Sequence, residues 1–346
     1  MKILTLNAGS SSLKCRCDTL TSTPRSEAPA PEWQTSADWT SDDPVESVLQ
    51  SAPGGVDVVG HRVVHGGTIH DSALLTDDVL REIASATELA PEHNRRALEA
   101  ISTARQFFGE RVRHVGVFDT AFHATMAAAA YTYPIPYSLT EEGIRRFGFH
   151  GISHRYAARR AAEILGGNAD ALRIVTCHLG NGASLAAVRG GKCVDTTMGF
   201  TPIEGLMMGE RSGSIDPGIL LHLVRTHGYS ADQLEQLLNR QSGLLGVSGV
   251  SNDMREILAA IDKGDRRARL AFEIYTHRLI REIGGMIAVL GGGDVLAFTG
   301  GVGEHCAPLR ERVAENFKFL EPRILVIPAQ EEWEIVRECW TVTSGR

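Results

Sequence analysis

The 346-residue sequence predicts an α/β fold built from two domains of one pattern. Strand-like segments alternate with helix-like segments along the chain, which is typical of α/β proteins. A strand, a turn rich in Gly and Ser and a second strand occupy residues 3–17, and the same layout returns at residues 174–188, about 171 residues later. The length allows each copy to lie in a domain with a core of its own. We expect the two domains to face each other across a cleft.

The remaining elements follow from apolar periodicity, caps and prolines. Apolar residues recur at helical spacing in residues 76–89, where Thr76 is a suitable N-cap, and Ser153 similarly predicts a helix start. Five of the 13 Pro lie within residues 19–55, which favours loops and edge strands there. In chain order we expect helices at 76–89, 95–108, 153–165, 218–226, 231–240, 253–261 and 265–290, strands at 112–118, 295–299 and 324–327, and a helix on either side of the last strand.

Composition and charge exclude several classes of protein. The chain is 43% hydrophobic and 22% charged, as in globular rather than disordered proteins. Its formal net charge of -7 argues against nucleic-acid binding, which needs Lys and Arg to displace counterions. The six Cys are scattered without a C-x-x-C pair, so we expect no zinc site, no disulfide framework and a cytoplasmic location. The longest apolar region, residues 283–298, contains five Gly and Asp294, so we expect no membrane span.

Three glycine-rich turns follow predicted strands, at residues 7–12, 180–183 and 300–303. Glycine lets backbone N–H groups converge on a phosphate, and Ser10 and Asn181 can add side-chain donors. Any one of them could be an ordinary turn, but three together predict a nucleotide cradle. None matches a P-loop or a dinucleotide-binding fingerprint.

Charged residues among glycines form a second group of candidates. Arg62, His150 and Arg211 lie in such strings, and a guanidinium fork next to glycine suits phosphoryl oxygens. For each one alone, a structural or surface role remains an alternative. Asp119 at a strand end could hold a metal or position a nucleophile, or it could cap a helix. Residues 331–332, both Glu, could equally be a pair at the first turn of a helix.

Five strings in order resemble the acetate kinase (acetokinase) family, at residues 6–14, 61–67, 117–123, 147–154 and 178–184. The resemblance implies the duplicated ribonuclease H-like fold of sugar kinases, actin and heat-shock chaperone ATPases, with an interdomain cleft. It also implies a homodimer that transfers phosphoryl reversibly from ATP to acetate, giving acetyl phosphate and ADP, with Mg²⁺ or alternatively Mn²⁺. The implied domains are residues 1–120 plus 329–346, and residues 121–328 with the nucleotide site and the dimer interface.

The resemblance also implies roles for individual residues. The implied catalytic residues are Arg62, His93, Asp119, His150 and Arg211. The implied phosphate and nucleotide residues are Asn7, Ser10, Ser12, Lys14, His178, Asn181, Gly182, Asp253, Met254, Arg255, Gly300, Gly301, Val302 and Gly303. The implied acyl pocket is Arg62, Val64, Glu92, Phe149 and Pro202, and the implied metal residues are Asn7 and Glu331.

The chain departs from the family pattern at several positions. Glu92 replaces an apolar residue of the acyl pocket, Ser214 replaces an Asp, Gln330 replaces an Asn, and three segments are shorter than usual. An ionised carboxylate beside acetate would repel it, so either Glu92 points away or the acid differs. A kinase for propionate, butyrate or another short carboxylate therefore remains an alternative, as does a catalytically silent nucleotide-binding regulator. A carboxylic acid is ionised at pH 7 and needs no base, so Asp119 is expected to be a metal or water-shell ligand.

Overall fold

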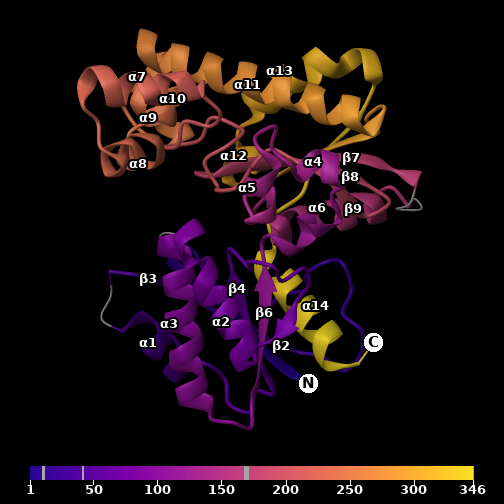
Figure 1. The fold of residues 1–346 in the computed structure, drawn as a ribbon. Coiled ribbons are helices and arrows are strands. Elements are labelled where there is room, and N and C mark those ends of the chain that lie inside the picture. Colours follow the sequence, from indigo (N-terminus) through magenta and orange to yellow (C-terminus); the bar gives the residue numbers. More distant parts are fainter. Residues whose placement is uncertain (10–11, 41–42, 167–170, 346) are drawn as a thin grey trace. The chain divides into compact units, whose positions relative to one another are not determined.

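The computed structural model describes residues 1–9, 12–40, 43–166 and 171–345, and the chain divides into two compact units (Figure 1). The first unit consists of Met1–Ala124, Phe149–Glu163 and Ala329–Arg346. The second consists of Thr125–Gly148 and Ile164–Pro328. Each unit contains one β-sheet.

Residues 149–163 belong to the first unit, although the sequence analysis placed them in the second domain. They form most of helix α6 (Gly151–Ile164), which buries mainly small and apolar residues and also forms ion pairs within the first unit. Arg155 and Arg159 of α6 form ion pairs of 2.7 and 2.5 Å with the C-terminal helix α14 (Glu331–Thr343). A buried carboxylate in α14 requires such partners, because an unpaired buried charge is costly.

The first unit is a six-stranded sheet in the order β3-β2-β1-β4-β6-β5. The hairpin β1–β2 is antiparallel, whereas β4 lies parallel to β1 and β6 lies parallel to β4. The strands are β1 (Lys2–Ala8), β2 (Ser12–Thr19), β3 (Trp33–Asp38), β4 (Val58–Val63), β5 (Ala73–Leu74) and β6 (Arg113–Phe118). The helices besides α6 and α14 are α1 (Pro44–Ser51), α2 (Asp77–Ser85), α3 (Pro91–Phe108) and the 3₁₀ turns η1 (Ala86–Leu89) and η2 (Ala121–Thr125).

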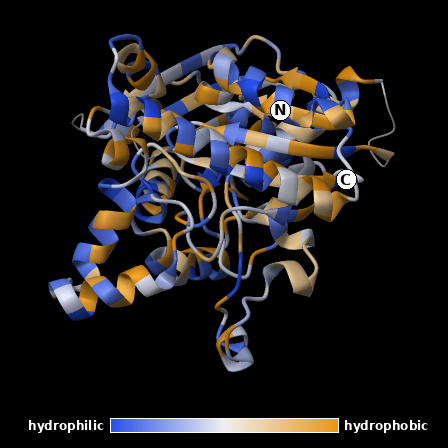
Figure 2. Ribbon diagram, turned by 90° about the horizontal axis from the view of Figure 1, so that it is seen from above, coloured by the Kyte–Doolittle hydropathy of each residue, from blue (hydrophilic) through white to orange (hydrophobic). Residues whose placement is uncertain are grey.

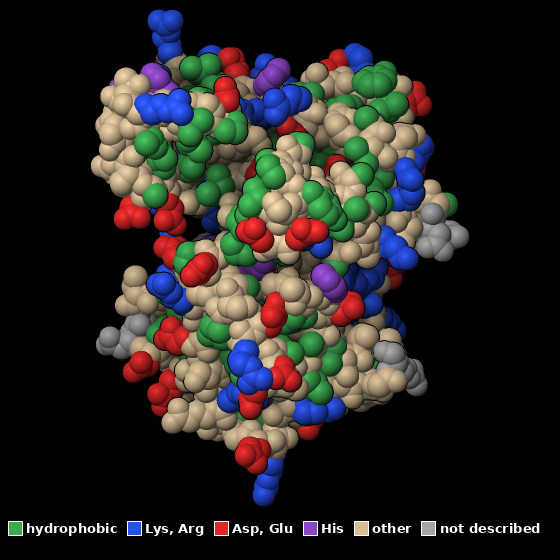
Figure 3. All heavy atoms as spheres, viewed as in Figure 1, with side chains coloured by type: hydrophobic (Ala, Val, Ile, Leu, Met, Phe, Trp, Pro, Cys, Tyr) green, Lys and Arg blue, Asp and Glu red, His purple; other side chains and the backbone are tan. Residues whose placement is uncertain are grey.

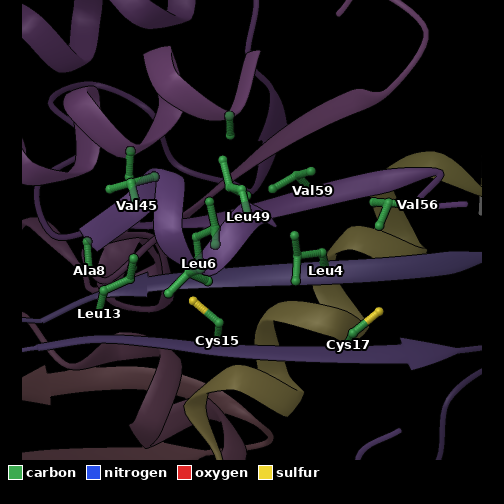
Figure 4. Close-up of a cluster of buried hydrophobic side chains, with 13 residues drawn as sticks. Leu4, Leu6, Ala8, Leu13, Cys15, Cys17, Val45, Leu49, Val56 and Val59 are labelled. Carbon is green, nitrogen blue, oxygen red and sulfur yellow. The ribbon is translucent and has the colours of Figure 1, made fainter. Parts of the chain in front are cut away.

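One core cluster lies between the β1–β2 hairpin and helix α1 (Figure 4). Leu4 and Leu6 of β1 and Leu13 of β2 are at most 1% exposed, and Leu49 of α1 packs with them. For residues 19–55, which include α1, the sequence predicted only loops and edge strands. β3 is indeed an edge strand, but α1 was missed, because its eight residues follow a proline-rich stretch that masked a short apolar face.

The second unit repeats the arrangement of the first. Its five-stranded sheet has the order β11-β10-β7-β8-β9, with an antiparallel β7–β8 hairpin and the parallel strands β10 and β11 beyond β7. This confirms the predicted duplication and the duplicated ribonuclease H-like fold class. The strands are β7 (Arg173–Leu179), β8 (Ala183–Arg189), β9 (Lys192–Thr196), β10 (Val295–Thr299) and β11 (Arg323–Val326). The helices are α4 (Ala128–Tyr131), α5 (Tyr137–Glu141), α7 (Pro217–His227), α8 (Ala231–Arg240), α9 (Gly243–Ser248), α10 (Met254–Asp262), α11 (Arg266–Leu290), α12 (Gly300–His305), α13 (Ala307–Phe317) and the 3₁₀ turn η4 (Lys318–Leu320).

Two local expectations were wrong. Residues 300–303 are not a turn but the first turn of helix α12, which follows β10 directly. Gly300 has φ of +78°, and a Cβ there would lie 2.8 Å from the carbonyl oxygen of Leu179, so glycine permits this tight corner. Ser153 does not cap α6, because the helix begins at Gly151 and Ser153 is buried within it.

Hydrophilic and hydrophobic residues alternate along the helices, as expected for helices with one face against a sheet (Figure 2). Within the described residues, no helix has an apolar stretch long enough to cross a bilayer. None of the residues of helix α7 is buried against the described part of the chain, which also holds for α8. In α7, Ile219, Leu221 and Val224 are 46 to 54% exposed, and Figure 3 shows hydrophobic side chains at the upper left, in the part of the second unit where Figure 1 draws α7 to α10.

Two buried histidines make the first unit sensitive to acid. His61 Nε2 and His114 Nδ1 lie 2.9 Å apart between β4 and β6, in stacked rings. Burial lowers the pKa of His114 to about 4 and lowers the pKa of His61 as well. Both rings therefore stay neutral in the folded chain, whereas the unfolded chain takes up protons below about pH 6.5.

We expect the free energy of unfolding to fall as the pH falls from about 6.5 toward 4, by up to roughly 3 kcal/mol from His114, with a further loss of the same sign from His61. Urea unfolding at pH 7.5, 5.5 and 4.5 would measure this loss. His114→Gln should flatten the pH dependence, whereas His70→Gln, at an exposed position, should leave it unchanged. An equally steep curve for His114→Gln would contradict this account.

Candidate active site

Three predicted site residues lie at one edge of the first sheet. Asn7 is near the end of β1, Arg62 is near the end of β4, and Asp119 directly follows β6. Leu6 pairs with His61 in the parallel β1–β4 register, and residues 62 and 63 pair with residues 117 and 118 of β6. Because the carboxyl ends of parallel strands meet at one edge, the three polar side chains come together there.

Arg62 is the centre of this cluster. Its Nε and Nη2 donate hydrogen bonds of 3.2 and 2.8 Å to Oδ2 of Asp119. Its Nη1 donates to Oδ1 of Asn7 over 3.0 Å and lies 3.5 Å from Oε2 of Glu331. One guanidinium group therefore joins three polar side chains from three separate segments of the first unit, as its fork of five donors allows.

Asn7 links the sheet to the first turn of α14. Its Nδ2 donates hydrogen bonds of 3.1 Å to Glu331 and 2.9 Å to Glu332. The side-chain oxygen of Asn7 thus accepts a hydrogen bond from Arg62, while its side-chain nitrogen donates to two carboxylates. The two glutamates lie at the N-terminus of α14, where the helix dipole also favours negative charge.

Burial and the ion pairs act against each other in this cluster. Burial raises the pKa of Asp119, and Arg62 opposes that rise. Burial also favours a neutral Arg62, but the carboxylates of Asp119 and Glu331 outweigh burial and raise the pKa of Arg62. Arg62 therefore carries a permanent positive charge that is only 12% exposed, which suits an anionic substrate.

His150 follows a sharp backbone turn beside Asp119. Its φ is +57°, in the left-handed region that non-glycine residues rarely occupy. The next residue, Gly151, donates its N–H to the carbonyl oxygen of Asp119 over 2.9 Å. A Cβ on Gly151 would lie 2.1 Å from that oxygen, so only glycine permits this approach. Backbone strain of this kind concentrates at functional sites.

The predicted acyl-pocket residues of the first unit differ in how deeply their side chains are buried. Val64 and Phe149 are 5% and 1% exposed, and Phe149 meets the ring of His65 edge-on at 5.6 Å between centroids. Glu92, in the first turn of α3, is exposed, which agrees with a side chain that points away from an apolar pocket. His93 beside it is half-buried.

The second unit contains a cavity of about 470 Å³ beside the turn of the β7–β8 hairpin. Its lining surface is largely apolar and also includes amide and charged side chains, which suits a planar base. It is lined by Gly180, Asn181, Asn252, Asp253, Met254, Arg255, Leu258, Gly301, Val302, His305 and Cys306. The structure thus brings together predicted nucleotide residues from three segments, namely the β7–β8 turn, the start of α10 and α12.

Local contacts explain the positions of the polar residues at this cavity. Asp253 is the N-cap of α10, accepts the N–H of Arg255 over 2.8 Å and also pairs with its guanidinium group. The N–H of Gly209 donates to the carbonyl oxygen of Asn181 over 2.9 Å. A Cβ on Gly209 would lie 1.9 Å from Oδ1 of Asn181, so glycine leaves room for this amide.

Other predicted residues lie elsewhere or outside the described residues. Ser10 falls outside them. Ser12 begins β2, and Lys14, also on β2, has an exposed side chain. His178 lies on β7, while Gly182, Gly300 and Gly303 are near the cavity in sequence but not in its lining. Arg211 donates to the carbonyl oxygen of Pro202 over 3.3 Å, so these two residues of the second unit are in direct contact.

Sequence reasoning missed several residues that the structure adds. Glu332 was named with Glu331 only as a possible pair at the first turn of a helix, and the structure adds its hydrogen bond with Asn7. His305 and Cys306 line the cavity because α12 is helical, which places them one turn after Gly301 and Val302. Asn252 and Leu258 flank the predicted residues 253–255, so their signal was proximity in sequence.

The oxygen ligands of the first unit fit a magnesium ion. Among the described residues, no three His, Cys, Asp or Glu side chains are grouped closely enough to hold a metal by themselves. Mg²⁺ does not need such a cage, because it usually binds one or two carboxylates together with waters and substrate phosphates. Oδ1 of Asp119 is buried and has no hydrogen-bond partner among the described residues, and Glu331 is 15% exposed.

Comparisons with known proteins identify the family. The profile of the acetokinase family matches residues 42–326. A Trichormus variabilis protein named acetate kinase is 45% identical over 401 aligned positions, covering 98% of this chain and 99% of that protein. Because this chain has 346 residues, that relative carries insertions which this chain lacks.

Two solved structures agree with this result. An acetate kinase from Porphyromonas gingivalis has a TM-score of 0.88 at 36% identity, and a propionate kinase from Francisella tularensis has a TM-score of 0.87 at 34% identity. In both comparisons 99% of each chain is covered. The two sheets of one topology, the Arg62 cluster and these matches lead to one conclusion: this chain belongs to the acetokinase family.

Proposed function

We propose that the protein is an acetate kinase, which transfers a phosphoryl group reversibly from ATP to acetate and forms acetyl phosphate and ADP. The observation that carries this proposal is the buried Arg62 cluster at the sheet edge, in a chain of this family. Nearly full-length relatives at 45% identity are named acetate kinases.

The chemistry requires charge stabilisation rather than proton removal. Acetate is already ionised at neutral pH, so its oxygen can attack without a general base. The barrier lies in bringing one anion to another and in stabilising charge on the phosphoryl oxygens. Arg62 supplies a guanidinium group for these oxygens, and its bonds to Asp119 and Asn7 fix its orientation. We propose that Arg211 and His150 are also catalytic residues, as the family resemblance implies.

We assign Mg²⁺ binding to Asp119 and Glu331, with Asn7 holding Glu331 in place. The support is the unpartnered oxygen of Asp119 and the two carboxylates next to one arginine. When bound, Mg²⁺ would neutralise charge on the phosphates of ATP. Asp119 is then an ion-binding group, which agrees with a reaction that needs no base.

Propionate is the strongest rival substrate, because the propionate kinase from Francisella tularensis has the same fold. Its identity to this chain, 34%, is close to the 36% of the acetate kinase from Porphyromonas gingivalis. Only the acyl pocket would separate the two activities, and an extra methylene is worth about 10- to 200-fold in specificity. Trapping the acyl phosphate as a hydroxamate, with acids of two to four carbons, tests the proposal directly. We expect the highest kcat/KM with acetate and little change in Glu92→Leu, since Glu92 is exposed. No hydroxamate with any acid would refute the proposed function.

We also propose that two copies associate through helix α7. Its exposed Leu221 and Val224 lie three residues apart on one face of the helix, and none of the residues of α7 is buried against the described part of the chain. A second copy can cover this face symmetrically. Sedimentation equilibrium should give a dimer for the wild type and a monomer for Leu221→Glu. Phe107→Glu, at a similarly exposed position on α3, should remain dimeric. A monomeric wild type would contradict this proposal.

A further inference from the structure

A loop of the second unit, residues 199–205, carries Pro202 and supports Arg211. The carbonyl oxygen of Pro202 accepts the hydrogen bond from Nη1 of Arg211. The position of this loop therefore sets the position of one hydrogen-bond acceptor of the guanidinium group. The residues that hold the loop itself include Glu204, which neither the family resemblance nor the sequence motifs singled out.

Glu204 is held by two side chains from the segment 131–148. Its Oε1 accepts a hydrogen bond of 2.7 Å from Nη2 of Arg146, and its Oε2 accepts the hydroxyl hydrogen of Tyr133. The oxygen of Tyr133 in turn accepts the N–H of Phe200 over 2.9 Å. Burial, together with the hydrogen bond to Glu204, raises the pKa of Tyr133, so its hydroxyl remains a donor at neutral pH.

Arg146 extends this network to the segment before the loop. Its Nη1 donates to three successive carbonyl oxygens, those of residues 196, 197 and 198, over 3.0 to 3.1 Å. Glu204 thus forms an ion pair with the half-buried Arg146. The side chain of Glu204 is 33% exposed and that of Arg146 is 17% exposed. Hydrogen bonds to charged groups are stronger than those between neutral groups, so this network should hold the loop firmly in place.

Gly199 shows how closely the network is packed. A Cβ at this position would lie 1.7 Å from Oε2 of Glu204 and 2.2 Å from the hydroxyl oxygen of Tyr133, so any larger residue would displace the hydrogen-bonded ends of both side chains. The carbonyl oxygen of Gly199 accepts the N–H groups of Phe147 and Gly148 over 3.0 and 3.3 Å. The network therefore also fixes the end of the segment that leads along the chain to Phe149.

We propose that Glu204 is a positioning residue for the acyl acceptor: through Tyr133 and Arg146 it holds the loop that presents Pro202 and supports Arg211. This inference rests on the proposed function, in which Pro202 and Arg211 serve the acid and the phosphoryl group. The loop does not contribute to the lining of the nucleotide cavity. Loss of Glu204 should consequently affect the use of the acid and spare the binding of ATP.

The variant Glu204→Gln keeps the size of the side chain and removes its charge. We expect the KM for acetate to rise about tenfold, while the KM for ATP stays within about twofold. If the loop that carries Pro202 is held less firmly, the acyl pocket should accept the larger acid more readily. The ratio of kcat/KM for acetate over propionate should therefore fall by at least about threefold. This ratio is measured on one preparation, so any loss of folded enzyme cancels.

Two further variants and one activity-independent measurement complete the test. Tyr133→Phe should shift the same ratio in the same direction, by less. Asp294→Asn removes an equally exposed carboxylate from an ion pair with Arg173 in the same unit and should change neither KM nor the ratio. Hydrogen–deuterium exchange of residues 199–205 should accelerate in Glu204→Gln but not in Asp294→Asn.

Wild-type acetate KM and wild-type exchange in Glu204→Gln would overturn the inference, as would an equal rise in the KM for ATP. If the wild-type protein phosphorylates no acid at all, the proposed function fails. Exchange then still decides whether Glu204 holds the loop.

Discussion

Asp119→Asn should lower the apparent kcat at a moderate, fixed Mg²⁺ concentration by about a hundred- to a thousandfold, the range for loss of one preorganised hydrogen-bonding group in an active site. Asparagine keeps the shape of the side chain but loses the charge that Arg62 and a divalent ion would share. We expect the loss to appear chiefly as a higher Mg²⁺ requirement, because acetate needs no base. Initial rates at saturating ATP across a range of Mg²⁺ concentrations would measure this shift.

A matched control is available on strand β2. Asp18 is a buried aspartate, 4% exposed, whose carboxylate accepts 2.6 and 2.9 Å hydrogen bonds from Arg16. Asp18→Asn disrupts an Arg–Asp pair in the same sheet and should leave the Mg²⁺ requirement unchanged. If Asp119→Asn keeps both a near-normal rate and a near-normal Mg²⁺ requirement, Asp119 does not bind the ion.

Arg62→Lys should lower kcat by about a thousandfold, even though the charge is retained. Lysine offers one ammonium group, which cannot reach Asp119, Asn7 and Glu331 in the planar arrangement that the guanidinium group provides. The remaining charge would sit where the side chain is flexible, so the phosphoryl oxygens would lose a fixed partner. Steady-state kinetics in both directions of the reaction would measure the effect.

Arg173→Lys serves as the control for this substitution. Arg173 also donates two hydrogen bonds to one carboxylate, that of Asp294, in the second unit. Its replacement should lower the melting temperature slightly and leave kcat unchanged. An Arg62→Lys enzyme with more than about a tenth of the wild-type rate would contradict a role that depends on the fork geometry.

The sequence predicted the elements whose signals are local. The hairpins at residues 3–17 and 174–188 alternate apolar residues around glycine-rich turns, and both are present as predicted. The N-cap at Thr76 was also correct, because its side chain accepts the N–H of Val79. Such signals depend on neighbouring residues only, so one chain segment contains all the information.

Elements that depend on distant partners were harder to predict. Helix α1 is short, and its apolar residues are recognisable as a buried face only because they pack against Leu4 and Leu6 of β1. The glycines at residues 300–303 suggested a turn, but β10 places them beside Leu179, where the chain continues as a helix. Local propensity cannot distinguish these outcomes, since tertiary contacts decide between conformations of similar energy.

The sequence by itself determined the α/β class, the duplication and the family, because these rest on periodicity, repeated strings and residue types. Only the tertiary structure decided that Arg62 joins Asp119, Asn7 and Glu331, residues that are up to 324 positions apart. The same holds for Glu204, whose partners Tyr133 and Arg146 come from another segment. The physical reason is that hydrogen bonds and ion pairs depend on distances of about 3 Å in space, which no spacing along the chain specifies.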